Sequence, residues 1–91
     1  MAKIAQSQVF KTVSLQYPYT TADGVGLKEL SIRRLTVGDM RQVTNQHTSA
    51  GDIEVTLFAR MSGLVPEDID QMDLADYEQL KMAYQDMTAG K

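Results

Sequence analysis

Apolar and polar residues alternate along positions 9–17, and this period of two predicts a β-strand with one buried face. One parity is mostly apolar and the other mostly polar, as shown by Val9, Val13, Leu15 and Tyr17 against Thr12, Ser14 and Gln16. Lys11 breaks the apolar series, and Phe10 lies on the polar side. We expect Pro18 to end the strand, because proline has no backbone N–H to donate to a neighbour.

A second alternating segment follows at 27–35, with Leu30 and Ile32 on its apolar side. Between the two segments stands Asp23-Gly24. Glycine readily adopts the positive φ that tight reversals need, so this pair predicts a turn. The two segments together therefore predict a β-hairpin.

From Thr36 onward the apolar residues recur every three or four positions, which is typical of amphipathic helices. The first predicted helix spans about 36–47, with Thr36 as N-cap and Asp39 three residues later. Its apolar stripe is expected at Val37, Met40, Val43 and His47. The second helix spans about 52–62, and Gly63 suits the left-handed residue that ends it. Its stripe is expected at Ile53, Leu57, Phe58 and Met61.

Pro66 predicts a short helical turn, because proline is well suited to the first turn of a helix. Asp73 then caps a last helix at about 74–87. Its stripe comprises Leu74, Tyr77, Leu80, Tyr84 and Met87. The expected fold is α+β, with an N-terminal β-hairpin followed by three helices and a short helical turn before the last. We expect residues 1–8 to form a flexible N-terminal arm and residues 9–88 a single domain.

The composition excludes several classes of protein. The 91-residue chain has a formal net charge of −3, and nucleic-acid binders usually carry a basic excess, so no nucleic-acid partner is expected. It has no cysteine, which excludes disulfides and thiolate metal sites. No signal peptide and no apolar run of membrane-spanning length is visible, so we expect no membrane partner.

Few residues offer chemistry. His47 is the only histidine and has no companions at the spacing of a zinc site or a catalytic triad. The acidic cluster lacks the glycine and ligand spacing of a calcium loop and is better explained by helix caps and a solvated face; it comprises Glu67, Asp68, Asp70, Asp73, Asp76 and Glu78. Gly24-x-Gly26 lacks the third glycine of a phosphate loop. We therefore expect a protein that is not an enzyme, with no catalytic residue, cofactor or metal.

The candidate partner-binding residues lie in the last helix and at the exit of the hairpin. Tyrosine and methionine are favoured at protein interfaces, although the same residues also suit the core face of a helix. Arg33 and Arg34 suit an acidic partner, and equally a charged strand edge that discourages aggregation. The candidate set is Tyr77, Leu80, Tyr84, Met87, Arg33 and Arg34.

Several short motifs follow one another in a recognisable order between residues 9 and 87. They are VSLQYPY (13–19), DG (23–24), LSIRRLTVGDMR (30–41), LFARMSGL (57–64) and IDQMDLADY (69–77). In this order and spacing they resemble the small tail assembly chaperones of contractile-tailed, Mu-like bacteriophages. Each motif alone is weak, and the specificity lies in their combination.

The resemblance implies a non-enzymatic chaperone that binds the tape-measure protein and keeps it soluble in the cytoplasm of the bacterial host during tail assembly. It carries over no catalytic residue, and an exposed apolar surface would favour a homo-oligomer or early capture by the partner. Two alternatives remain open: a structural tail or head-completion protein of the virion, and a small helix-turn-helix DNA-binding regulator built on 36–47 and 52–62. The second of these helices offers only Arg60 as a base for DNA.

Overall fold

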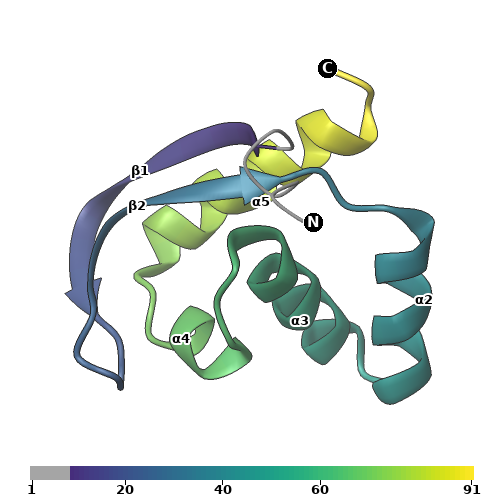
Figure 1. Ribbon diagram of the computed structural model, residues 1–91, viewed down its shortest axis with the longest axis horizontal. Helices are drawn as coiled ribbons and strands as arrows, with labels where there is room; N and C mark the ends of the chain where they lie inside the picture. The colour runs from purple at the N-terminus through teal and green to yellow at the C-terminus, as the bar shows by residue number, and fades with distance from the viewer. Residues whose placement is uncertain (1–8) are drawn as a thin grey trace, which may run out of the picture.

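The computed structural model describes residues 9–91, so the predicted arm at 1–8 lies outside the described residues. A two-stranded antiparallel sheet packs with one face against a group of helices (Figure 1). The elements are β1 (Val9–Thr20), β2 (Gly26–Arg33), α2 (Val37–Gln46), α3 (Ala50–Ser62), α4 (Pro66–Asp70) and α5 (Leu74–Thr88). The predicted α+β order, with a hairpin, three helices and a short turn before the last helix, is confirmed.

The hairpin reverses as expected at Asp23-Gly24. Gly24 has a φ of 85°, and its amide donates to the carbonyl oxygen of Thr21 at 2.9 Å. The inner face of the sheet carries Val13, Leu15, Leu30 and Ile32, all buried. Strand alternation thus identifies the buried face correctly in the middle of each strand.

The expected end of β1 at Pro18 is wrong, because the strand continues to Thr20. Pairing with β2 is irregular between Ser14 and Tyr19, so Pro18 lies in a stretch where the ladder does not need its missing N–H. Beyond this stretch the hydroxyl of Tyr19 donates to the backbone carbonyl of Asp68 at 2.7 Å. That bond ties the extended end of the hairpin to α4.

The helix caps follow the sequence closely. Thr36 and Asp39 form a reciprocal capping box at the start of α2. Gly63 ends α3 with a φ of 74°, and Asp73 caps α5. α3 begins two residues earlier than predicted because Ser49, rather than a later residue, accepts from the amide of Asp52.

α3 is the centre of the fold and contacts β2, α2, α4 and α5. Its side chains Leu57, Phe58, Ala59 and Met61 are buried. α5 lies along β1, as Figure 1 shows, and contributes the buried Leu80, Ala83 and Met87. α2 packs against α3 at the far end of the molecule and buries Val43 completely.

Some members of the predicted apolar stripes and strand face are exposed, and those predictions are wrong. Val37 is 75% exposed, Met40 39% and Leu74 73%. Val37 and Leu74 occupy the first positions of their helices, where the neighbouring elements do not cover them. Val9 and Tyr17, expected on the buried side of the first strand, are also exposed. The exposed pair Val37 and Met40 borders a surface hollow.

Candidate functional site

The four predicted site residues of α5 divide into two kinds. Leu80 and Met87 belong to the hydrophobic core, with exposed fractions of 0% and 4%. Tyr77 and Tyr84 are half-buried, and each packs its ring against Phe58 at a centroid distance of 5.3 Å. Tyr84 and part of the Met87 side chain line a surface hollow, whereas Leu80 is completely buried.

Tyr77 has a further contact through its hydroxyl, which donates to Oε1 of Glu54 in α3 at 2.6 Å. Burial, and then this bond to a carboxylate, raise the pKa of Tyr77 well above its usual value. The bond joins α3 to α5, so Tyr77 has a structural task in the fold.

Arg33 is held by the neighbouring helix. Both of its terminal nitrogens donate to the carboxylate of Asp39 at 3.0 Å. The same carboxylate accepts from Arg60 of α3 at 3.3 Å and from the amide of Thr36 at 2.8 Å. The hydrogen bonds from Arg33 are the main reason that the pKa of Asp39 lies well below its usual range. This cluster fixes the junction of β2, α2 and α3.

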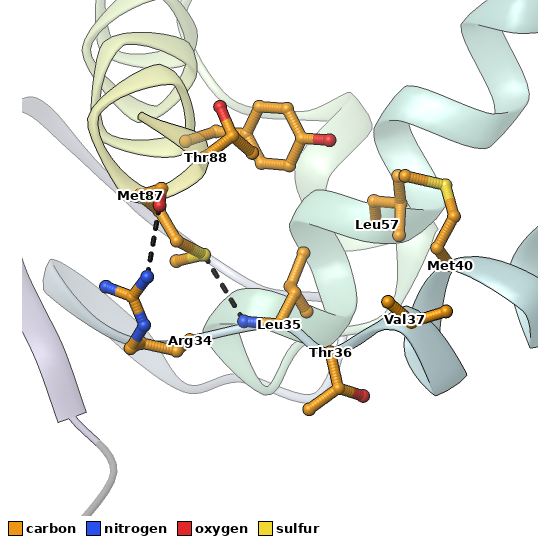
Figure 2. Close-up of a pocket in the computed structure, with 9 residues that line it drawn as sticks. Arg34, Leu35, Thr36, Val37, Met40, Leu57, Met87 and Thr88 are labelled. Atoms are coloured by element: carbon orange, nitrogen blue, oxygen red, sulfur yellow. Dashed lines mark hydrogen bonds between the residues drawn. The ribbon is translucent and has the colours of Figure 1, made fainter. Parts of the chain in front are cut away.

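Arg34 turns the other way, toward α5. It donates to the backbone oxygen of Met87 at 3.1 Å, and its guanidinium lies 5.2 Å from the centre of the Phe10 ring. The next amide, that of Leu35, donates to the sulfur of Met87 at 3.2 Å, and Figure 2 shows both bonds. The two side chains thus face different partners within the fold, Arg33 on α2 and Arg34 on α5, and their role in binding an acidic partner stays a prediction.

A hollow of about 260 Å³ opens between the start of α2 and the end of α5. Val37 and Met40 line it from α2, Leu57 from α3, and Met87 and Thr88 from α5 (Figure 2). Its remaining lining residues are Arg34, Leu35, Thr36 and Tyr84. The large side chains here are mostly apolar, yet Val37 and Met40 are open to solvent.

A second hollow of about 270 Å³ continues the first along α3. The two share Met40, Leu57 and Tyr84. The second is completed by Ala50, Ile53, Glu54 and Phe58. We call the two together the α2–α5 groove: α2 and α5 form its walls, and α3 forms its floor.

The α2 wall of this groove lies outside the predicted partner-binding residues. The helical period predicts Val37 and Met40 in a core stripe, because a period gives the direction of a side chain and not what covers it. The alternation at 27–35 likewise predicts Leu35 within a strand. The available signal was that α2 has only Val43 as a strongly apolar residue beyond these two.

Three other residues with titratable side chains cap helices or pack inside the fold. Asp73 caps α5, Asp76 is buried against β1, and His47 closes the C-terminal end of α2. Within residues 9–91, no three histidine, aspartate or glutamate side chains gather as a metal site would require, and no helix is long and apolar enough to cross a membrane. α3 packs on four other elements, and Arg60, its basic residue, already pairs with Asp39, so this helix offers little free positive charge to DNA.

Comparison with known proteins agrees with the resemblance seen in the motifs. No curated protein and no solved structure matches the chain. The model of the family described as "Phage tail assembly chaperone proteins, E, or 41 or 14" matches residues 12–89, which include the hairpin from Thr12 onward and the helices α2 to α5. The narrower assignment to Mu-like phages stays a prediction. The chain therefore belongs to the phage tail assembly chaperone family.

Proposed function

We propose that this protein is a non-enzymatic chaperone that binds the tape-measure protein of its phage and keeps it soluble while the tail is assembled. The observation that carries the proposal is the α2–α5 groove, where Val37 and Met40 stay exposed beside an apolar floor. Family membership supports a role in tail assembly with protein partners. The identity of the partner comes from the motif resemblance.

The physical reason lies in the nature of a long, hydrophobic, helical partner. Such a chain exposes apolar surface before the tube encloses it, and exposed apolar surface drives aggregation. Covering it removes apolar area from water, which stabilises by about 25 cal/mol per Å². Binding of this kind is reversible and needs no activated side chain, so the chaperone can later be displaced.

The place of action that fits this role is the cytoplasm of the bacterial host, where tail proteins are made and assembled. We also propose that the chain self-associates, as a surface of several exposed apolar residues favours. These residues include Tyr17, Val65, Leu74 and Met82.

Co-expression tests the function directly. The tape-measure protein from the same tail gene cluster is produced alone, with this chain, and with a Leu80→Asp variant as a control. Leu80 is fully buried, so an aspartate there should unfold the chaperone. The culture then still synthesises a second chain of the same length, but one without a folded binding surface. The soluble fraction of the tape-measure protein should rise only with the native chain. An equal soluble fraction in all three cultures would refute the proposal.

Mass spectrometry of purified phage particles addresses the alternative of a structural virion protein. A chaperone should be absent or present in far fewer copies than the tube protein. Stoichiometric copies in the particle would favour the structural role.

A further inference from the structure

We propose that the α2–α5 groove binds one amphipathic helix of a foreign polypeptide, with the apolar stripe of that helix over Leu57 and an acidic side chain beside Arg34. This inference rests on the proposed function, because it names the form and the charge of the partner segment. It is nevertheless tested separately, at the level of single residues in the groove.

The dimensions of the groove suit inserted side chains. Its two hollows, of about 260 and 270 Å³, meet at Met40, Leu57 and Tyr84 and so form one elongated depression along α3. Its floor runs from Ala50 to Leu57, which at the helical rise is about 10 Å, or two turns. Apolar residues spaced three, four and seven apart on one helix cover such a length.

The walls favour a helix over a strand. An added strand needs unpaired backbone groups along a sheet edge. The groove is bounded mainly by the sides of α2, α3 and α5, whose backbone groups are paired within their own helices. A segment that enters it must therefore satisfy its own backbone hydrogen bonds, as a helix does.

A second copy of this chain is a poor occupant. Apart from Val37 and Met40 of α2, which line the groove themselves, the exposed large apolar side chains on helices within residues 9–91 are Leu74 and Met82 of α5. These two are eight positions apart and make no stripe of three. Residues 9–91 thus offer no exposed apolar stripe on a helix that is longer than this pair, which favours another protein as the source of the bound segment.

The charge of the partner follows from Arg34, which lines the end of the groove. Its guanidinium is positioned by the carbonyl of Met87 and the ring of Phe10, both of which are uncharged. Among the described residues it makes no ion pair, whereas Arg33 and Arg60 share Asp39. A carboxylate on the incoming helix would find a pre-oriented cation and form a charge-assisted hydrogen bond.

Fluorescence anisotropy with labelled synthetic peptides tests the proposal. The probes tile the tape-measure protein of the same phage, each peptide long enough for about six helical turns. Peptides with an apolar stripe and a flanking acidic residue should bind and gain helical circular dichroism. Met40→Glu should weaken this binding by roughly tenfold or more, because it buries an unpaired charge.

Met82→Glu is the matched control, since Met82 is an exposed methionine of α5 outside the groove. It should change the peptide affinity by less than about twofold. Val37→Asp is a second groove variant, and a carboxylate in the first turn of α2 does not threaten the helix. It should weaken binding as Met40→Glu does.

A charge exchange tests the role of Arg34. Arg34→Glu should weaken binding of the peptide that carries the acidic residue. Replacing that acidic residue by lysine should restore binding to this variant. Arg41→Glu, an exposed position of α2 that does not line the groove, controls for net charge and should show no such exchange.

Several results would overturn the proposal. They are equal effects of Met40→Glu and Met82→Glu on peptide affinity, peptides that bind without gaining helix, and a dimer of this chain that Met40→Glu dissociates. Failure of every peptide to bind would also overturn it. If the full tape-measure protein were still kept soluble in that case, the proposed function would stand and only the groove assignment would fall.

Discussion

The carboxylate of Asp76 in α5 accepts the backbone amide of Gln16 in β1 at 2.7 Å. Its second oxygen accepts the amide of Tyr17 at 2.9 Å. The two amides lie in the irregular stretch of β1, where β2 does not provide a regular set of partners. Asp76 is only 2% exposed, so an acidic residue within a predicted solvated cluster is in fact part of the protein interior.

Replacing Asp76 by alanine should lower the free energy of unfolding by about 2–3 kcal/mol, because two backbone donors lose a charged acceptor. Urea denaturation at neutral pH measures this change. Asp70→Ala, at an exposed position of the same acidic segment, should alter stability by less than about 0.5 kcal/mol. Equal effects at the two positions would mean that the strand irregularity does not depend on Asp76.

Asp39 should make the protein sensitive to acid. Its pKa is lowered in the folded state, mainly by the hydrogen bonds from Arg33, so its stabilising contribution is present above the unfolded pKa of about 3.9. The contribution is lost as the pH falls below that value toward the folded pKa. Asp39→Asn should cost about 2–3 kcal/mol at pH 7, where a charged hydrogen-bond network is broken, and much less at pH 2–3.

Thermal or urea unfolding at several pH values between 2 and 7 checks this behaviour. Asp86→Asn is a suitable control, because its pairs with Lys11 and Lys91 are long, at 4.0 Å, and exposed. A difference between native protein and Asp39→Asn that stays constant over this pH range would contradict the assignment.

Much of the fold could be predicted because local signals agree with one another. The Thr36–Asp39 box, Gly63 and Asp73 each mark a helix end, and alternation around Leu30 marks the inner sheet face. These signals depend on neighbours in the sequence. The continuation of β1 past Pro18 could not be predicted in the same way, since the preceding amides of Gln16 and Tyr17 bond to Asp76, about sixty positions away.

The candidate site was predicted less well for a related reason. Periodicity correctly marks Tyr84 and Met87 as facing inward from α5, but it cannot tell a sealed core from a groove wall. Val37 and Met40 follow the same spacing as Val43, but they border the hollow between α2 and α5 while Val43 is buried. How two helices pack is a tertiary property with no counterpart in a single stripe.

Core and groove residues should therefore respond differently to truncation. Leu80→Ala should lower the free energy of unfolding by about 2–5 kcal/mol, because it opens a cavity in the core. Val37→Ser should cost less than about 0.5 kcal/mol, since its side chain is already in water. Chemical denaturation of both variants tests this division. A large loss for Val37→Ser would mean that the groove wall is part of the core in solution.

Tyr77 provides the corresponding test at high pH. Its raised pKa means that the folded state favours the neutral phenol, so its contribution to stability is complete below the unfolded pKa of about 10 and is lost as the pH rises above it. Tyr77→Phe keeps the ring against Phe58 but removes the bond to Glu54, which should cost about 1–2 kcal/mol at pH 7. In an ultraviolet titration, the phenol that ionises at the highest pH in the native protein should be missing from Tyr77→Phe, whereas Tyr17→Phe, at a half-exposed ring, should leave this last transition in place. If Tyr17→Phe removed this last transition instead, the protected phenol would not be that of Tyr77. The hydrogen bond from Tyr77 that links α3 to α5 would then lose its support.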